Sequence, residues 1–289
     1  MALKLQTPVV AEACRTGISY GDRIVVLGSC FADQMGQKLL DYGFQATVNP
    51  FGTLYNPVSI ANAVSRLASA VPFTEADVVE VGAGDGRFCS FSHHTSFARS
   101  TPEAFLDEAN AALSEASRAW ADADKVIVTL GTAWAFRLET TGETVANCLK
   151  HPAREFSRYR LSAGQVTALL QGWAVRFPEK QFIFTVSPIR HLADGAHGNQ
   201  LSKSTLLLGI EAALPSFGGR AEYFPAYEIV LDELRDYRFY AEDMVHPSAQ
   251  TVGYLWDRFL TWGLPDAERE RYEKAERAFR ASCHRQNGK

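Results

Sequence analysis

Residues 23–42, RIVVLGSCFADQMGQKLLDY, constrain the fold more than any other stretch, because the hydrophobic period changes within them. Residues 24–27 form a short, uncharged and mostly β-branched run, which is typical of a strand buried on both faces of a parallel sheet. After this run the period becomes helical, and the buried face of that helix is expected to carry Phe31, Met35, Leu39 and Leu40. The stretch therefore predicts a parallel strand that turns directly into a helix.

Ser29 stands at this predicted turn, between the strand and the helix. Ligands of open α/β sheets bind at the carboxyl ends of the strands, and the first turn of a helix offers free N–H groups and a positive dipole end. A serine hydroxyl in that place has what an acyl-transfer nucleophile needs. Serine is also a favoured helix N-cap, which is the commoner role, so both interpretations stay open on this stretch alone.

The rest of the chain alternates strand-like and helical segments, without an internal repeat or a long flexible linker. Glycine turns inside 78–91 and 136–146 predict β-hairpins, and the glycines at 82–86 lack the spacing of a dinucleotide fingerprint. We predict one α/β domain over residues 1–289, with a helical extension at about 265–289. Further strands are predicted at 46–48, 125–130, 181–186 and 221–224, and further helices at 57–67, 102–120, 164–177, 200–214, 248–262 and 266–282.

Composition narrows the class of protein. The 289 residues carry a net charge of −4 and a pI near 6.0, which argues against nucleic acid and basic membrane-surface partners. No apolar run approaches the roughly 20 residues of a membrane span, and residues 1–15 do not resemble a secretory signal. The 5 cysteines are scattered, without a Cys-x-x-Cys pair, so we expect a reduced, cytoplasmic protein rather than a disulfide scaffold or a zinc module.

Two polar segments are interpreted first as structural features. The run 232–238, DELRDYR, predicts a mostly solvated surface with ion pairs. His93 and His94 are adjacent in an extended segment, so their side chains point to opposite faces and cannot readily chelate one metal ion. One of the pair can reach a cleft while the other packs, and His94 is the candidate for substrate contact.

Asp243 and His246 form the second candidate element of a site. They stand three residues apart in AEDMVHPS (241–248), just before a helix whose first turn suits Pro247. Both side chains can then lie on one side of a turn, where the carboxylate holds one ring nitrogen and the other nitrogen faces a nucleophile. The order of Ser first and Asp-x-x-His last differs from the Gly-x-Ser-x-Gly hydrolases.

These elements together resemble the SGNH (GDSL-like) hydrolase superfamily, and the string GSCFA at 28–32 resembles more closely the GSCFA family. The resemblance runs through nearly the whole chain in the family's order. The segments that carry it are NPFGTLYNP at 49–57, TLGTAWAF at 129–136, NCLK at 147–150, TVSPIRH at 185–191 and YRFYAEDMVHPS at 237–248. The resemblance implies a three-layer α/β/α fold with a central, mainly parallel, flavodoxin-like sheet. It also implies Ser29 as nucleophile, His246 as base and Asp243 as the acid that orients it.

The resemblance is less complete for the oxyanion hole. The superfamily uses the nucleophile's N–H, a Gly and an Asn from a Gly-x-Asn block; Ser29 and Gly52 can supply the first two. The third block reads Gly-Thr-Ala at 131–133, so Thr132 or Asn147 is the candidate replacement donor. Leu149 also departs from the family, whose NC-x-K motif often carries His.

Other residues are candidates for roles around this site. Cys30 is a rival nucleophile, because a helix N-terminus lowers a thiol pKa, but Ser29 is favoured and Cys30 is expected to face the packed side. Arg190 and His191 follow the predicted strand 181–186 and so lie at the ligand edge. Arg190 can bind a substrate carboxylate or be tied to a core carboxylate, and His191 can carry a proton. Trp134 completes the predicted substrate-binding set.

Two classes of function follow. The first is a serine esterase that hydrolyses an O-acyl ester, for example an O-acetyl group on a carbohydrate, or an O-acyltransferase with the same triad. The second is a non-catalytic carbohydrate-binding module on the same fold. The expected partner is a small-molecule or carbohydrate ester, with no cofactor, metal, nucleic acid or membrane.

Overall fold

The computed structural model describes residues 7–12, 14–82 and 84–287, with side chains as far as residue 283. Ala83, within the predicted glycine turn, and residues 1–6, on which part of the signal-peptide prediction rests, lie outside the described residues.

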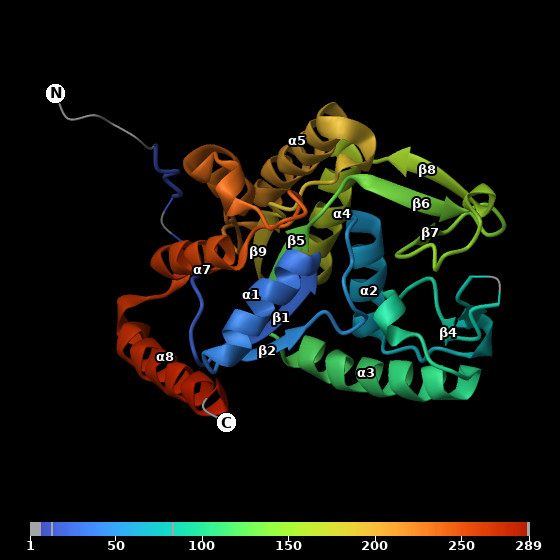
Figure 1. Ribbon diagram of the computed structural model, residues 1–289, viewed down its shortest axis with the longest axis horizontal. Coiled ribbons are helices and arrows are strands. Elements are labelled where there is room, and N and C mark those ends of the chain that lie inside the picture. The colour runs from blue at the N-terminus through green and yellow to red at the C-terminus, as the bar shows by residue number, and fades with distance from the viewer. Residues whose placement is uncertain (1–6, 13, 83, 288–289) are drawn as a thin grey trace.

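A parallel sheet forms the centre of the molecule (Figure 1). Its order is β10-β9-β5-β1-β2, and every neighbouring pair is parallel. The strands are β1 (Arg23–Gly28), β2 (Gln45–Val48), β5 (Lys125–Leu130), β9 (Gln181–Val186) and β10 (Ala221–Tyr223). Numbered along the chain, the described sheet strands run 2-1-3-4-5, an order common in doubly wound folds, so the direction of winding changes between β1 and β5.

Helices cover both faces of this sheet, which confirms the prediction of a three-layer α/β/α arrangement. Alternate strand residues point to opposite faces. Val25, Leu27 and Val128 pack with α2 (Pro57–Ser69), α3 (Pro102–Asp122), α4 (Ala163–Arg176) and α5 (Gly195–Ala213). Val26, Ile127 and Ile183 pack with α1 (Cys30–Asp41) and α7 (Ala249–Gly263), against which α8 (Asp266–Asn287) also rests. Each such fully buried aliphatic side chain contributes about 1.5–3 kcal/mol to stability.

The predicted hairpins are present beside the sheet. β3 (Val79–Glu80) pairs with β4 (Phe88–Cys89), and β6 (Trp134–Leu138) pairs with β7 (Thr144–Val145). A further strand, β8 (Phe156–Arg160), adds to the other edge of β6 and was not predicted. Its sequence FSRYR carries two arginines, whose guanidinium groups lie over the Trp134 ring at 4.3 and 5.9 Å. Because arginines pack on the aromatic ring through cation–π contacts, the sequence of this strand lacks the apolar–polar alternation that identifies most strands.

One local prediction is wrong and another holds with one exception. Leu40 is 43% exposed, because the last turn of α1 buries only the row that contains Phe31, Met35 and Leu39. The 232–238 run is mostly solvated and carries ion pairs, as predicted, although Glu233 within it is only 4% exposed. The π-helical segment η6 (Ile229–Leu234) turns its carboxylate inward, where it accepts hydrogen bonds from Arg258 and from the Val9 N–H.

Within the described part of the chain, no helix combines the length and the apolar character needed to cross a membrane.

Candidate active site

Ser29 lies between the carboxyl end of β1 and the N-terminus of α1, as predicted. Gly28 makes the turn possible: its φ is +142°, and a Cβ there would lie 2.1 Å from the carbonyl oxygen of Thr129 in β5. No side chain fits this gap, since the obstacle is backbone. The Ser29 N–H donates to the same Thr129 oxygen over 3.3 Å.

The Ser29 hydroxyl caps α1. Its oxygen accepts a hydrogen bond from the Phe31 N–H at 3.3 Å, and the residue is 0% exposed. Among the described residues no hydrogen bond joins the hydroxyl to the ring of His246. In this conformation the hydroxyl therefore lacks the exposure that an acyl-transfer nucleophile needs, because the first turn of α1 and the loop after β5 enclose it; a Cβ on Gly131 would lie 3.4 Å from the Ser29 Cβ.

Asp243 and His246 form the predicted pair. One carboxylate oxygen of Asp243 accepts the backbone N–H groups of Val245 and His246, each at 2.9 Å. The other oxygen is 2.6 Å from Nδ1 of His246. The two N–H groups and the imidazole hold the Asp243 pKa down to about 2, so the carboxylate is ionised at every pH near neutrality. The pair is half exposed, and Nε2 of His246 is the ring nitrogen left for a partner.

Arg190 fastens this turn to the carboxyl edge of the sheet. Its backbone N–H donates to the Val245 oxygen at 3.1 Å, and its guanidinium donates to the Met244 oxygen at 3.0 Å. Met244 has a φ of +57°, so the turn is a sharp one. No carboxylate among the described residues pairs with Arg190. Of the two alternatives for Arg190, the one with a core carboxylate partner is therefore excluded for the described residues, and the arginine binds main-chain oxygen instead.

His191 lies beside His246 and inside the protein. Its backbone N–H donates to Asn199 at 2.9 Å, and its ring meets the edge of the Tyr55 ring at 6.2 Å. Burial, together with the nearby Lys203 and His246, lowers the His191 pKa to about 4. The ring is therefore neutral at physiological pH, and its buried Nε2 has no partner among the described residues.

Lys203, on α5, also belongs to this edge, although no sequence motif marks it. Its side chain is 0% exposed, and Nζ donates to the carbonyl oxygens of Gly131 and Ser187 at 2.7 Å each. Burial lowers its pKa to about 7. Its position in the helical repeat could have identified it as buried, because it lies one turn before Leu206 and one turn after Asn199 on the buried face of the helix.

The predicted oxyanion donors are largely occupied. The Gly52 N–H donates to the Asn49 oxygen at 2.8 Å, so the prediction that it points into a pocket is wrong; the tight turn at Asn49, with a φ of +40°, directs it back to the main chain. The Thr132 N–H donates to the Tyr55 oxygen at 2.9 Å, and its hydroxyl bonds to Ser202. The carbonyl of Asn147 accepts the Leu149 N–H at 2.8 Å.

Two donors near these positions make no hydrogen bond to any described residue. One is the amide nitrogen of Asn147. The other is the N–H of Cys30, the first helical residue, which directly follows Ser29. The thiol of Cys30 is half-buried, with Sγ 3.4 Å from the Tyr55 hydroxyl. Cys30 therefore offers an unoccupied helix N-terminal donor at the proposed nucleophile.

The paired histidines separate as predicted. His93 is 0% exposed among phenylalanines that include Phe51 and Phe73, and its pKa is lowered to about 3 by burial. His94 is half-buried, and its Nδ1 caps the short helix η2 (Thr95–Phe97). Gly52 makes room for His94, since a Cβ on Gly52 would lie 2.4 Å from the His94 Cβ.

Trp134 is less open to a substrate than predicted. The Arg158 guanidinium lies 4.3 Å from the centre of its ring and is held there by an ion pair with Asp194. The indole nitrogen is buried and has no partner among the described residues. Arg158, on β8, thus covers one face of the Trp134 ring.

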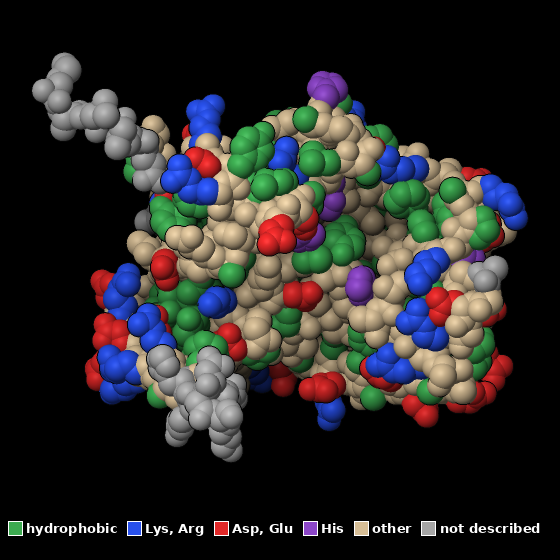
Figure 2. Space-filling model, viewed as in Figure 1, with side chains coloured by type: hydrophobic (Ala, Val, Ile, Leu, Met, Phe, Trp, Pro, Cys, Tyr) green, Lys and Arg blue, Asp and Glu red, His purple; other side chains and the backbone are tan. Residues whose placement is uncertain are grey.

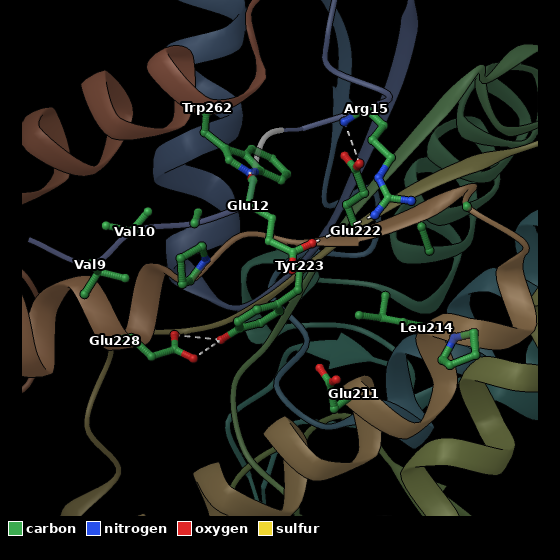
Figure 3. Close-up of a pocket in the computed structure, with 15 residues that line it drawn as sticks. Val9, Val10, Glu12, Arg15, Glu211, Leu214, Glu222, Tyr223, Glu228 and Trp262 are labelled. Atoms are coloured by element: carbon green, nitrogen blue, oxygen red, sulfur yellow. Dashed lines mark hydrogen bonds and ion pairs between the residues drawn. The ribbon is translucent and has the colours of Figure 1, made fainter.

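A separate cavity of about 600 Å³ lies along the edge strand β10, away from Ser29 (Figure 3). Several of its polar groups are paired within the protein. Tyr223 donates to both carboxylate oxygens of Glu228, at 3.0 and 2.8 Å. Glu222 accepts the Arg15 N–H at 2.6 Å. The bond from Arg15 to Glu222 anchors the N-terminal segment over the edge strand, which gives the cavity a structural explanation.

The fold and the site define a doubly wound α/β protein with an Asp–His pair and a helix-capping serine at the carboxyl edge of one sheet. Figure 2 shows histidine and acidic side chains close together near the middle of one face. The chain belongs to the GSCFA family, whose model matches residues 23–259, from β1 through most of α7. No protein of curated function matches the chain.

Proposed function

We propose that this protein is a serine esterase of the SGNH type that hydrolyses an O-acyl ester, such as an O-acetyl group on a carbohydrate. The observation that carries the proposal is the Asp243–His246 hydrogen bond, 2.6 Å long, on a turn fastened to the edge where Ser29 ends β1. An ionised carboxylate on Nδ1 fixes the tautomer that leaves Nε2 free to accept a proton. A cytoplasmic location fits the cysteines, which are free thiols.

In the proposed reaction Nε2 of His246 takes the Ser29 proton as Oγ attacks the acyl carbon. The alcohol then leaves with that proton, and water releases the acyl group from Ser29 by the reverse sequence. The charge that develops on the acyl oxygen needs preorganised donors, and the Cys30 N–H is the unoccupied one beside Ser29. An O-acyltransferase would use the same steps with a sugar hydroxyl in place of water.

The chemistry requires a conformational step, because Ser29 is 0% exposed. A substrate carbonyl reaches Oγ only after the groups around it move, and that movement has to bring His246 within hydrogen-bond distance. The same burial favours a second candidate, a non-catalytic binding module in which Ser29 serves only as the cap of α1.

A fluorophosphonate probe with mass mapping separates the two candidates. We expect the probe to label Ser29 in the folded protein, and Ser29→Ala and His246→Ala each to abolish labelling. Ser162 provides a matched control, since it caps α4 in the same way, with its oxygen accepting the Gln165 N–H at 3.2 Å. Ser162→Ala should lose about 1 kcal/mol of stability and keep full labelling.

The binding-module alternative predicts a different pattern. Ser29→Ala would then behave like Ser162→Ala, with a small loss of stability, and the wild-type protein would remain unlabelled while folded. That result would refute the esterase proposal.

A further inference from the structure

A cavity of about 480 Å³ opens beside the Asp243–His246 turn, between α5 and the segment that follows β10. We call it the tyrosine pocket. It is lined by aromatic, polar and charged side chains, among them Arg190, Asn199, Tyr237 and Tyr240, together with aliphatic side chains such as Leu192 and Leu231.

The tyrosine pocket is joined to the proposed active site through main-chain hydrogen bonds. Arg190, in its wall, holds the Met244 oxygen at 3.0 Å. Tyr240, also in the wall, forms a β-bridge with Pro247, and the Ala241 N–H donates to the His246 oxygen at 2.7 Å. A molecule that fills the pocket therefore lies alongside the turn that carries the proposed base.

The charges of the wall leave one cation uncompensated. Arg235 pairs with Asp232 at 3.5 Å, and Asp236 pairs with Arg238 at 2.7 Å. Arg190 has no carboxylate partner in the described chain; its guanidinium bonds to a main-chain oxygen and lies 5.4 Å from the centre of the Tyr240 ring. A guanidinium presents several N–H donors in a planar fork, so its remaining donors suit a carboxylate.

The uncharged lining suits a sugar ring. Tyr237 is 68% exposed, and the hydroxyls of Tyr237 and Tyr240 make no hydrogen bond to any described residue. Asn199 is only 6% exposed, and its amide nitrogen has no hydrogen-bond partner among the described residues, although its oxygen is taken by the His191 N–H. Aromatic faces stack on the C–H face of a pyranose, while free amide and hydroxyl groups bind its hydroxyls.

We propose that the tyrosine pocket binds a carboxylated sugar, a uronic acid unit, with its carboxylate against Arg190 and its ring against the tyrosines. This inference names the substrate class of the proposed esterase. It rests on the proposed function only in taking the sugar to be part of the substrate. The esterified hydroxyl would then lie on the side of the sugar that faces His246.

Binding is measured without turnover, in Ser29→Ala, by chemical-shift titration with methyl glucuronide and methyl glucoside. We expect the glucuronide to bind roughly tenfold or more tightly, because the two sugars differ only in the group that meets the arginine. Arg190→Gln should remove that preference. Arg118→Gln, an exposed arginine on α3, makes the same change in net charge and should keep it.

Because Arg190 also holds the turn, a second variant tests the pocket independently. Tyr237→Ala removes an exposed ring without breaking a described hydrogen bond, and it should weaken both sugars several-fold while preserving their ratio. The proposal would be overturned if the two sugars bound with equal affinity, if neither sugar bound, or if the preference for the glucuronide survived Arg190→Gln.

The two proposals can be refuted independently of each other. Probe labelling of Ser29 without glucuronide binding would leave the esterase and reject the uronic acid pocket. Glucuronide binding without labelling would leave the pocket and reject the esterase.

Discussion

The ammonium group of Lys203 lies 2.7 Å from the carbonyl oxygen of Gly131 and 2.7 Å from that of Ser187. These carbonyls follow β5 and β9, so one side chain from α5 ties together two loops at the proposed active edge. The side chain is fully buried, and no carboxylate in the described chain pairs with it. Burial without a counter-charge is why its pKa falls to about 7.

We predict that Lys203 makes the protein more stable as the pH rises from about 7 to about 8. The folded pKa is about 7, whereas an unfolded lysine titrates near about 10.4, so the unfolded chain binds the extra proton in this window. Stability then rises with pH, by at most about 1.4 kcal/mol per pH unit. Lys203→Met should remove this slope, which urea unfolding at several pH values measures.

Lys125 supplies the control for this slope. It is also buried, but its ammonium has Asp22 at 3.7 Å as a carboxylate partner. Lys125→Met should therefore keep the wild-type slope. If Lys203→Met kept it as well, the assignment of the titration to Lys203 would be wrong.

We predict that Gly52→Ala destabilises the protein more than Gly142→Ala does. Both glycines have a left-handed backbone, with φ of +77° and +73°, which costs an L-residue about 1–2 kcal/mol. A Cβ on Gly142 meets open space, whereas one on Gly52 would lie 2.4 Å from the His94 Cβ. Relieving that overlap should add about 1 kcal/mol or more. Urea unfolding compares the two; equal losses would show that His94 moves freely.

The central strands of the sheet were predictable because they are buried on both faces. Lys125–Leu130 and Gln181–Val186 were predicted to the residue, since each is an apolar run bounded by charged or turn residues. β8 was not predicted, because its residues pack through arginine and aromatic side chains rather than through an apolar face. The burial of Glu233 could not be predicted from the local sequence, because its partner, Arg258, lies on another helix.

The Asp243–His246 pair of the candidate site was predictable, whereas the backbone donors and the enclosure of Ser29 were not. The Asp243–His246 pair follows from local spacing, which a turn of the chain enforces. The direction of the Gly52 N–H depends on the dihedral angles at Asn49, and residue types do not report these. The enclosure of Ser29 likewise depends on the close approach of Gly131, a contact between segments distant in sequence.

We predict that Asp243→Asn preserves the turn but removes most of the activity. In the wild-type protein the N–H groups of Val245 and His246 both donate to one carboxylate oxygen of Asp243 at 2.9 Å, and the oxygen of an asparagine can still accept them. The amide NH₂ then faces Nδ1 of His246 and favours the tautomer that is protonated on Nε2. In well-studied triads this change lowers the rate by on the order of ten thousandfold. Hydrolysis of an activated ester, with circular dichroism for folding, measures it; an unchanged rate would exclude a triad role.

The choice of nucleophile gives the last prediction. Ser29 and Cys30 are adjacent, and Cys30 is the intrinsically better nucleophile once ionised. Its Sγ, however, lies 3.4 Å from the Tyr55 hydroxyl, on the helical side of the turn, whereas Ser29 ends the strand at the carboxyl edge. We therefore expect Ser29→Ala to abolish ester hydrolysis and Cys30→Ala to keep it within a few-fold.

Cys30→Ala also tests the proposed oxyanion donor, because the substitution removes the thiol and leaves the backbone N–H of residue 30 in place. Cys30→Pro removes that N–H at the first helical position, where proline is tolerated without loss of an intrahelical hydrogen bond. If this N–H stabilises the oxyanion, Cys30→Pro should lower the rate on the order of a hundredfold or more relative to Cys30→Ala. A folded Cys30→Pro as active as Cys30→Ala would exclude the N–H, and an inactive Cys30→Ala beside an active Ser29→Ala would make the cysteine the nucleophile.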